Sequence, residues 1–192
     1  MVLDFDPIYR DHQDAREYAA ITIGNCGANS EEGAETIVRH AGMMKALISC
    51  LANGLEVRMQ ETTVVALKNC AASSQEAAYV IAQSDEALAL FKDLALQDDH
   101  SRLRDVAVGA INSISRSPRA VPRLKKMGFQ SEVLCELLWT KDNGAASDLR
   151  KLTLACAVVN IEASDPQKLP AKVLQRWIHS KDGKQAMANM VK

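Results

Sequence analysis

Four asparagines at similar spacing are the residues of this chain whose chemistry stands out. Asn25, Asn69, Asn112 and Asn160 are separated by 44, 43 and 48 residues, and each closes a segment of small and apolar residues. A side-chain amide offers both a hydrogen-bond donor and an acceptor. A period in the forties is typical of stacked helical repeats. The spacing therefore favours a repeat protein, a class whose function is to bind other proteins.

No other set of residues has the spacing of a catalytic or metal site. The four histidines, His12, His40, His100 and His179, are scattered, and no Cys-x-x-Cys or His-x-x-x-His pair occurs. The sequence also lacks a glycine-rich phosphate loop, a nucleophile elbow and a dinucleotide fingerprint. We therefore expect no catalytic residues, no metal and no cofactor. A helical-repeat enzyme is the least favoured alternative.

Composition narrows the class of partner. The chain has 192 residues, of which 47% are hydrophobic, 24% charged and only 4% aromatic, with a net charge of −1. Nucleic-acid binders usually carry a clear basic excess, so nucleic acid is not the expected partner. The sequence has no apolar run long enough for a membrane span and begins without the pattern of a signal peptide. These features predict a cytoplasmic protein, with the nucleus as the alternative.

The five cysteines point to the same compartment. Their number is odd, they form no Cys-x-x-Cys pair, and all lie in helical, mostly apolar segments. Free cysteine behaves as a small buried hydrophobe. We therefore expect reduced thiols in the core. The five are Cys26, Cys50, Cys70, Cys135 and Cys156.

Each asparagine closes an amphipathic helix. The positions two and five residues before it, and the position one after it, hold mostly apolar residues that fall on the opposite side of a 3.6-residue helix. We predict that these columns are buried and that the asparagine lies outside the buried face. The columns are Ile23, Leu67, Ala110, Val158; Ala20, Val64, Ala107, Ala155; and Cys26, Cys70, Ser113, Ile161.

A second recurring landmark divides each repeat into three helices. Gly42 and Gly128 open apolar segments 86 residues apart, and Asp85 lies at the midpoint. A glycine there allows a sharp bend between the first and second helices. The expected first helices are 31–41, 75–84 and 118–127; the second are 43–53, 86–97 and 129–141; the third are 56–72, 101–116 and 146–163, preceded by a lone third helix at 12–28.

Several residues have the properties of helix ends. Ser73 with Glu76 is a capping-box pair, and Ser117 followed by Pro118 is a favourable helix start. Pro122 is expected to distort the helix in which it lies.

No low-complexity linker interrupts the chain, so residues 1–192 are expected to form one domain. Its predicted parts are a partial repeat at 12–28, repeats at 30–72, 73–116 and 117–163, and C-terminal capping helices at 166–192.

With its recurring asparagines and its second landmark at Gly42, Asp85 and Gly128, the sequence resembles the armadillo repeat family. The resemblance rests on IVRHAGMMKALISCL followed by TVVALKNCA, and on RLKKMGFQSEVLCELL followed by CAVVNIE, and it covers roughly residues 12–163. It implies an all-α, right-handed α-solenoid of about three and a half three-helix repeats. It also implies a concave groove, lined by the third helices, in which asparagine amides bind the main chain of an extended peptide.

The resemblance assigns the groove residues by column. The asparagines Asn25, Asn69, Asn112 and Asn160 would hold the peptide main chain, and the alternative is that their amides bond only to neighbouring helices. Nuclear-import members carry a tryptophan four residues before the asparagine, but here that column is Ile21, Val65, Val108 and Cys156, so a nuclear-localisation signal is not the expected ligand. The column seven before gives a weakly polar floor of Tyr18, Thr62, Asp105 and Thr153.

The densest positive charge forms a second candidate surface. It comprises Arg116, Arg119, Arg123, Lys125 and Lys126. The simplest interpretation is a solvated surface, and the alternative is an edge that binds acidic protein, RNA or phospholipid.

The resulting hypothesis is a non-enzymatic scaffold or adaptor that binds an extended peptide or helix of a partner protein. The alternative is a regulatory or assembly subunit that docks a folded partner through its end or convex surfaces. Because the first repeat is incomplete, a homo-oligomer or a longer solenoid also stays open.

Overall fold

The structure is a computed structural model, and it describes residues 7–52, 56–96, 101–129 and 145–162, together with His179 and Lys184. Within these ranges all the regular secondary structure is helical. In chain order the helices are α1 (Pro7–Asn29), α2 (Glu31–Arg39), α3 (Ala41–Ala52), α4 (Val57–Ser73), α5 (Gln75–Ala82), α6 (Asp85–Leu96), α7 (Ser101–Ser115), α8 (Val121–Lys126) and α10 (Ala145–Glu162).

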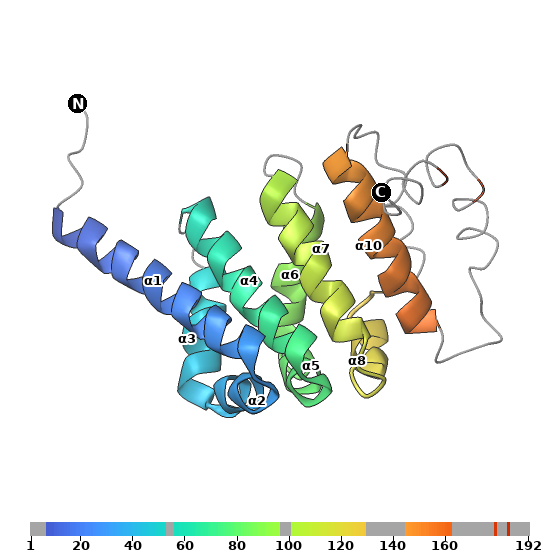
Figure 1. Cartoon of the computed structure of the whole chain (residues 1–192), viewed down its shortest axis with the longest axis horizontal. Helices are drawn as coiled ribbons and strands as arrows, with labels where there is room; N and C mark the ends of the chain where they lie inside the picture. The colour runs from blue at the N-terminus through green and yellow to red at the C-terminus, as the bar shows by residue number, and fades with distance from the viewer. Residues whose placement is uncertain are drawn as a thin grey trace.

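Four long helices lie side by side in a row. α1, α4, α7 and α10 follow one another across the molecule, each packed on the next (Figure 1). The short helices α2, α5 and α8 lie along one edge of the row, beside the C-terminal ends of α1, α4 and α7, and α3 and α6 pack on α4 and α7, respectively. The three-helix succession α2–α3–α4 thus recurs as α5–α6–α7.

The helix ranges expected from the sequence are confirmed within two residues, apart from the start of α1, which lies five residues earlier than expected, and the first turn of α8. The expected third helices are α4, α7 and α10, and the expected lone helix at 12–28 is α1. The predicted helix at 129–141 and the capping segment at 166–192 fall outside the described residues, apart from Phe129, His179 and Lys184.

The burial of the helix columns follows the predicted register. The four residues five positions before each asparagine are all buried, as are Leu67, Ala110 and Val158 two positions before. Ile23 is half-buried, and Cys26 is exposed because no described helix covers that side of α1. The core prediction is therefore confirmed for α4, α7 and α10 and is wrong for Cys26.

Two helix starts differ from the expectation. Ser74, not Ser73, caps α5, and its Oγ accepts hydrogen bonds from the N–H groups of Glu76 at 3.2 Å and Ala77 at 3.3 Å. α8 begins at Val121 rather than at Pro118. Pro122 then lies in the first turn of α8, where a missing N–H breaks no helical bond, so the predicted distortion is wrong.

The two landmark glycines have different roles. Gly128 has a φ of +78°, and it ends α8: the N–H of Phe129 donates to the Leu124 carbonyl at 3.0 Å and the N–H of Gly128 to the Lys125 carbonyl at 3.1 Å. This pattern is a Schellman motif, which favours glycine because of its left-handed backbone. Gly42 instead lies inside α3. The predicted bend at a glycine therefore holds only at Gly128.

The cysteines are less buried than expected. Cys70 is buried and Cys50 half-buried, whereas Cys26 and Cys156 are exposed, and all four are free thiols. Burial raises the pKa of the Cys70 thiol to about 11. Cys135 lies outside the described residues.

No helix among the described residues is long and apolar enough to cross a membrane.

Candidate functional site

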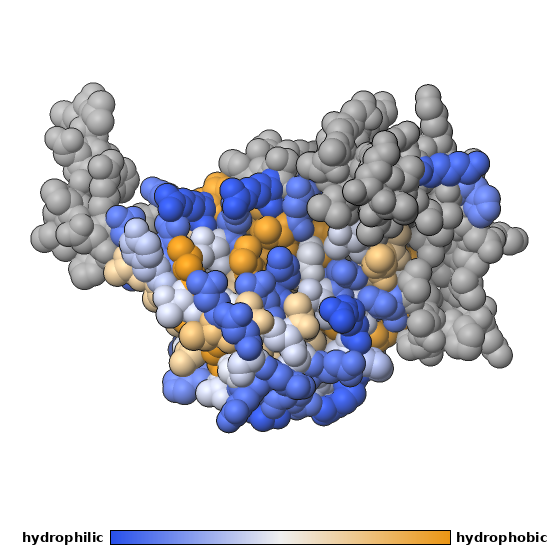
Figure 2. Space-filling model, viewed as in Figure 1, coloured by the Kyte–Doolittle hydropathy of each residue, from blue (hydrophilic) through white to orange (hydrophobic). Residues whose placement is uncertain are grey.

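A hollow of about 740 Å³ lies on the face of the row between α1 and α4. In the same orientation as Figure 1, Figure 2 shows hydrophobic surface in the middle of this face, bordered by hydrophilic residues above and below. The lining comes from α1 and α4, with one residue from α7. It consists of Glu17, Ala20, Ile21, Gly24, Asn25, Val57, Arg58, Glu61, Thr62, Val65, Ala66, Asn69 and Arg102.

The floor of the hollow depends on close packing of α1 against α4. A Cβ placed on Gly24 would lie 3.0 Å from the Ala66 Cα, and a Cβ on Gly27 would overlap the Cys70 Sγ. Both glycines therefore let the two helices approach more closely than residues with side chains would allow. Because α4 is so near, the Asn69 amide reaches the Gly24 carbonyl and donates a hydrogen bond to it at 3.3 Å.

The asparagines divide into two pairs. Asn25 and Asn69 line the hollow, so the register brings two of the four predicted residues together. Asn112 and Asn160 bond to each other: the Asn160 amide donates to the Asn112 Oδ1 at 3.4 Å and to the Ser115 Oγ at 3.1 Å. The alternative in which the amides bond to neighbouring helices therefore holds for Asn160, for the Asn112 side-chain oxygen and for the Asn69 side-chain nitrogen.

Asn25 differs from the other three. Its side chain is exposed, and among the described residues its amide makes no hydrogen bond within the chain. The Asn69 side chain is half-buried, and only its amide nitrogen has a partner in the described part of the chain. The hollow therefore contains amide donors and acceptors available to a bound molecule.

The other predicted groove residues are placed unevenly. Thr62 and Val65 line the hollow, and the Thr62 hydroxyl donates to the Arg58 carbonyl at 2.9 Å. Tyr18 is 67% exposed on α1 but does not line the hollow. Asp105 is paired with Arg150 on α10. Val108 is only 1% exposed, so its prediction as a contact residue is wrong: this position faces the core of the row.

A ladder of ion pairs joins successive long helices, and reasoning from the sequence missed it. Glu17 Oε1 lies 2.7 Å from Arg58 Nε, and Glu61 Oε1 lies 2.5 Å from Arg102 Nε. Asp105 and Arg150 form the third rung. The three arginines are spaced by 44 and 48 residues, and their acidic partners by 44 and 44. A search for charges with the period of the asparagines would have found both columns.

In both ion pairs at the hollow, the arginine side chain is much more exposed than the glutamate side chain. The side chains of Glu17 and Glu61 are 13% and 17% exposed, whereas those of Arg58 and Arg102 are 76% and 83% exposed. The four charges sum to zero, but the positive groups lie outermost. The hollow therefore has a small apolar floor, amides at one side and exposed guanidinium groups at the other.

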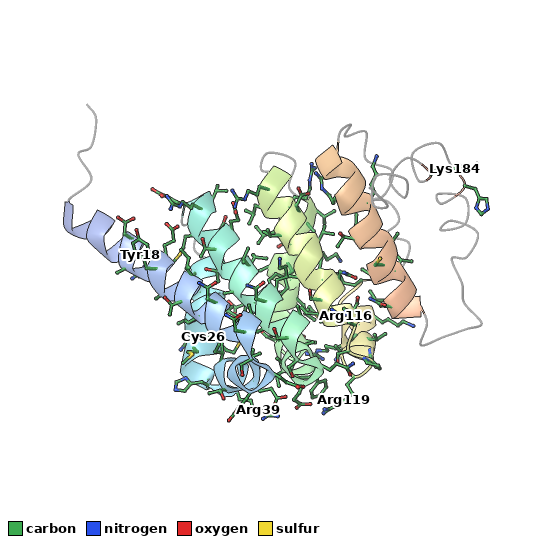
Figure 3. All side chains as sticks on the ribbon, in the orientation of Figure 1. Tyr18, Cys26, Arg39, Arg116, Arg119 and Lys184 are labelled. Atoms are coloured by element: carbon green, nitrogen blue, oxygen red, sulfur yellow. The ribbon has the colours of Figure 1, made fainter. Side chains whose placement is uncertain are left out.

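The predicted basic surface is partly neutralised by internal contacts. Arg119 pairs with Glu76, and its guanidinium lies 3.9 Å from the centre of the Tyr79 ring. Arg123 pairs with Asp85. Figure 3 shows Arg119 and Arg39 on the same edge of the molecule, the edge along which α2, α5 and α8 lie. Arg116 and Lys126 are exposed and Lys125 is half-buried.

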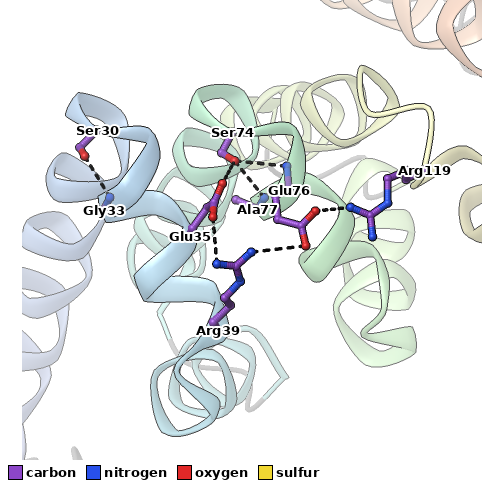
Figure 4. A network of polar contacts seen from close by, with 8 residues as sticks. All are labelled: Ser30, Gly33, Glu35, Arg39, Ser74, Glu76, Ala77 and Arg119. Carbon is purple, nitrogen blue, oxygen red and sulfur yellow. Dashed lines mark hydrogen bonds and ion pairs between the residues drawn. The ribbon is translucent and has the colours of Figure 1, made fainter.

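Figure 4 shows the network to which Arg119 belongs. Arg39 bridges Glu35 at 3.0 Å and Glu76 at 3.5 Å, and the Ser74 hydroxyl donates to Glu35 at 2.9 Å. These contacts join α2, α5 and the turn before α8, so Arg119 has an ion-pair partner within the chain, although 61% of its side chain is exposed.

In the described part of the chain, no three or more His, Cys, Asp and Glu side chains lie close enough together to hold a metal ion.

Comparisons with known proteins support the fold only. No protein family profile matches the chain, and no curated protein matches it. Among solved structures, the crystal structure of an engineered protein, a Northeast Structural Genomics Consortium target, is similar with a TM-score of 0.67 and 20% sequence identity. The match covers 92% of this chain and 71% of that one. At this identity the similarity concerns the arrangement of the helices.

Proposed function

We propose that this chain is a non-enzymatic protein-interaction module of the armadillo type, a single right-handed α-solenoid of about three and a half repeats. It binds an extended peptide or a helix of a partner protein along the face formed by α1, α4, α7 and α10. The observation that supports this proposal most strongly is the hollow between α1 and α4, which contains two asparagines from equivalent positions of successive helices.

The geometry of the hollow fits a peptide main chain. An extended chain advances about 3.3 Å per residue, and packed helices lie about 8–10 Å apart, so about three residues span the distance from one long helix to the next. A segment crossing α1 and α4 would then present one peptide unit to Asn25 and another to Asn69. The half-buried side chains of Val57 and Val65 would contact an apolar side chain of that segment.

Selection from a phage-displayed library of random nonapeptides tests this proposal, with the immobilised full chain as bait. We expect enriched peptides to bind the unaltered chain and to lose binding to a Val65→Arg variant, whose new side chain fills the hollow. Val80→Arg on α5 is the matched control, because Val80 is likewise half-buried but lies outside the hollow. Asn25→Ala should also weaken binding, and it should do so without loss of stability since this amide makes no bond among the described residues.

Two results would contradict the proposal. The first is the absence of any enriched peptide. The second is enrichment of peptides that bind the Val65→Arg variant as tightly as the unaltered chain.

A second candidate function is docking through the end of the row. The side of α1 that faces away from α4 exposes Ala15, Ala19, Thr22 and Cys26. Counted from the asparagines, these positions match Met59, Thr63, Ala66 and Cys70 of α4, all of which are buried. A regulatory or assembly subunit would use such a surface for a folded partner. Thr22→Lys would then abolish capture of that partner, whereas Val65→Arg would not.

A further inference from the structure

We infer that the hollow between α1 and α4 selects an acidic segment, with Arg58 and Arg102 as the groups that bind its carboxylates. The inference rests on the proposed function and specifies the chemistry of the partner. It is carried by the placement of charge around the hollow, where the cations are outermost and the anions recessed.

Both arginines remain accessible despite their ion pairs. A guanidinium has five N–H donors, and the contacts with Glu17 and Glu61 are made through Nε. With 76% and 83% of the two side chains exposed, most donors face solvent. A carboxylate arriving from outside therefore meets an arginine that is already held in place by a recessed glutamate.

The N-terminal ends of α4 and α7 add partial positive charge near the two arginines. Arg58 and Arg102 are the second residues of α4 and α7. The first turn of a helix carries a partial positive charge from its unpaired N–H groups. The rim of the hollow therefore has the exposed guanidinium groups and two helix N-termini on one side, which favours an anion over a cation.

The recessed glutamates have two opposite effects. They orient the guanidinium groups, and this lowers the entropic cost of binding. They also repel an incoming carboxylate, so the acidic preference is weaker than two free arginines would give. Replacing Glu61 by glutamine removes the negative charge, and the glutamine carbonyl can still accept a hydrogen bond from Arg102. The variant should therefore bind an acidic segment more tightly.

The apolar floor of the hollow favours a bound segment that carries an aliphatic side chain as well as a carboxylate. Ile21 is 37% exposed, and Val57 and Val65 are half-buried around the same hollow. A bound segment would bury one aliphatic side chain there and place a carboxylate about three residues away along the main chain.

The test uses the random nonapeptide library and then single labelled peptides. We expect the selected peptides to be enriched in Asp and Glu near an aliphatic residue. In fluorescence anisotropy at low salt, Arg102→Gln should weaken binding of a selected peptide about tenfold. Glu61→Gln should strengthen it about threefold, from the Coulomb energy of one charge about 6 Å away. Arg39→Gln is the matched control, because Arg39 is also an exposed, ion-paired arginine but lies outside the hollow.

The gain expected from Glu61→Gln cannot arise from partial unfolding, so it separates recognition from structure. Enrichment of Lys and Arg, or a loss of affinity in Glu61→Gln, would overturn the inference in favour of a basic partner. Enriched peptides without charge bias that still require an open hollow would overturn it and leave the proposed function standing. If no peptide is enriched, both fail.

Discussion

Replacement of Gly27 by alanine tests the close packing of α1 on α4 that forms the floor of the hollow. The added Cβ would overlap the Sγ of Cys70, which is fully buried. Overpacking of a core typically costs about 1–3 kcal/mol. Alanine gains about 1 kcal/mol over glycine from its higher helix propensity. We therefore expect Gly27→Ala to lower the free energy of unfolding by about 1 kcal/mol, the middle of a range of about 0–2 kcal/mol.

The same substitution should have the opposite effect when the sulfur is removed. In a Cys70→Ala background the nearest atoms of residue 70 to the new Cβ are its Cα and Cβ, both at 3.6 Å, which is ordinary contact. Only the helix-propensity gain then remains, and Gly27→Ala should be neutral or stabilising by up to about 1 kcal/mol. The two substitutions should thus be coupled by about 2 kcal/mol.

Urea unfolding followed by circular dichroism at 222 nm measures all four members of this cycle. Gly109→Ala is the control, because its Cβ would meet only the flexible aliphatic chain of Lys68, at 3.2 Å. It should change stability little or raise it slightly. Purely additive effects of Gly27→Ala and Cys70→Ala would refute the packing of α1 on α4 described above.

Three further predictions concern the elements around the site. Cys26 and Cys156 should react with N-ethylmaleimide at neutral pH, and Cys70 should not. Because the folded-state pKa of Cys70 is raised to about 11, the free energy of unfolding should fall by roughly 2–3 kcal/mol between about pH 9 and about pH 11, and this fall should vanish in Cys70→Ala. Ser74→Ala should destabilise the chain by about 1–2 kcal/mol in urea unfolding, and Ser73→Ala by much less; equal effects would contradict the assignment of the cap. Asp105→Asn should lower the free energy of unfolding by about 1–3 kcal/mol, because its partner Arg150 is 6% exposed, whereas Glu17→Gln, whose partner is exposed, should lower it by less than about 1 kcal/mol in the same assay. The reverse order would contradict the burial of the Asp105–Arg150 pair.

The helical fold was predictable because the residue positions that are packed in each long helix recur at a regular interval in the sequence. The residues five positions before each asparagine are small or branched and all buried, and a 3.6-residue period alone identifies their face. The helix starts were less predictable, since Ser73 and Ser74 are equivalent caps in sequence and only the chain path decides between them. Pro122 shows the same limit, because its effect depends on whether it lies in the first turn or the interior of a helix.

The candidate site was predictable only in part, for a different physical reason. The asparagine column locates Asn25 and Asn69, but it does not reveal that Asn160 bonds to Asn112 across two helices. Burial of Val108 and exposure of Cys26 depend on which helices have neighbours on both sides. Predicting the charged rim of the hollow would have required knowing that residues 41 positions apart form ion pairs, as Glu17 does with Arg58. Such pairings follow from the packing of successive helices rather than from any local pattern.

The most direct test of the central claim is a map of where a selected peptide binds the chain. The measurement is a ¹H–¹⁵N correlation titration of the labelled chain with a nonapeptide taken from the library. We predict the largest shifts at the side-chain amides of Asn25 and Asn69 and at the backbone amides of Ile21, Thr62 and Val65. Shifts confined to α2, α5 and α8, with the amides of Asn25 and Asn69 unchanged, would contradict the claim that this face binds the partner.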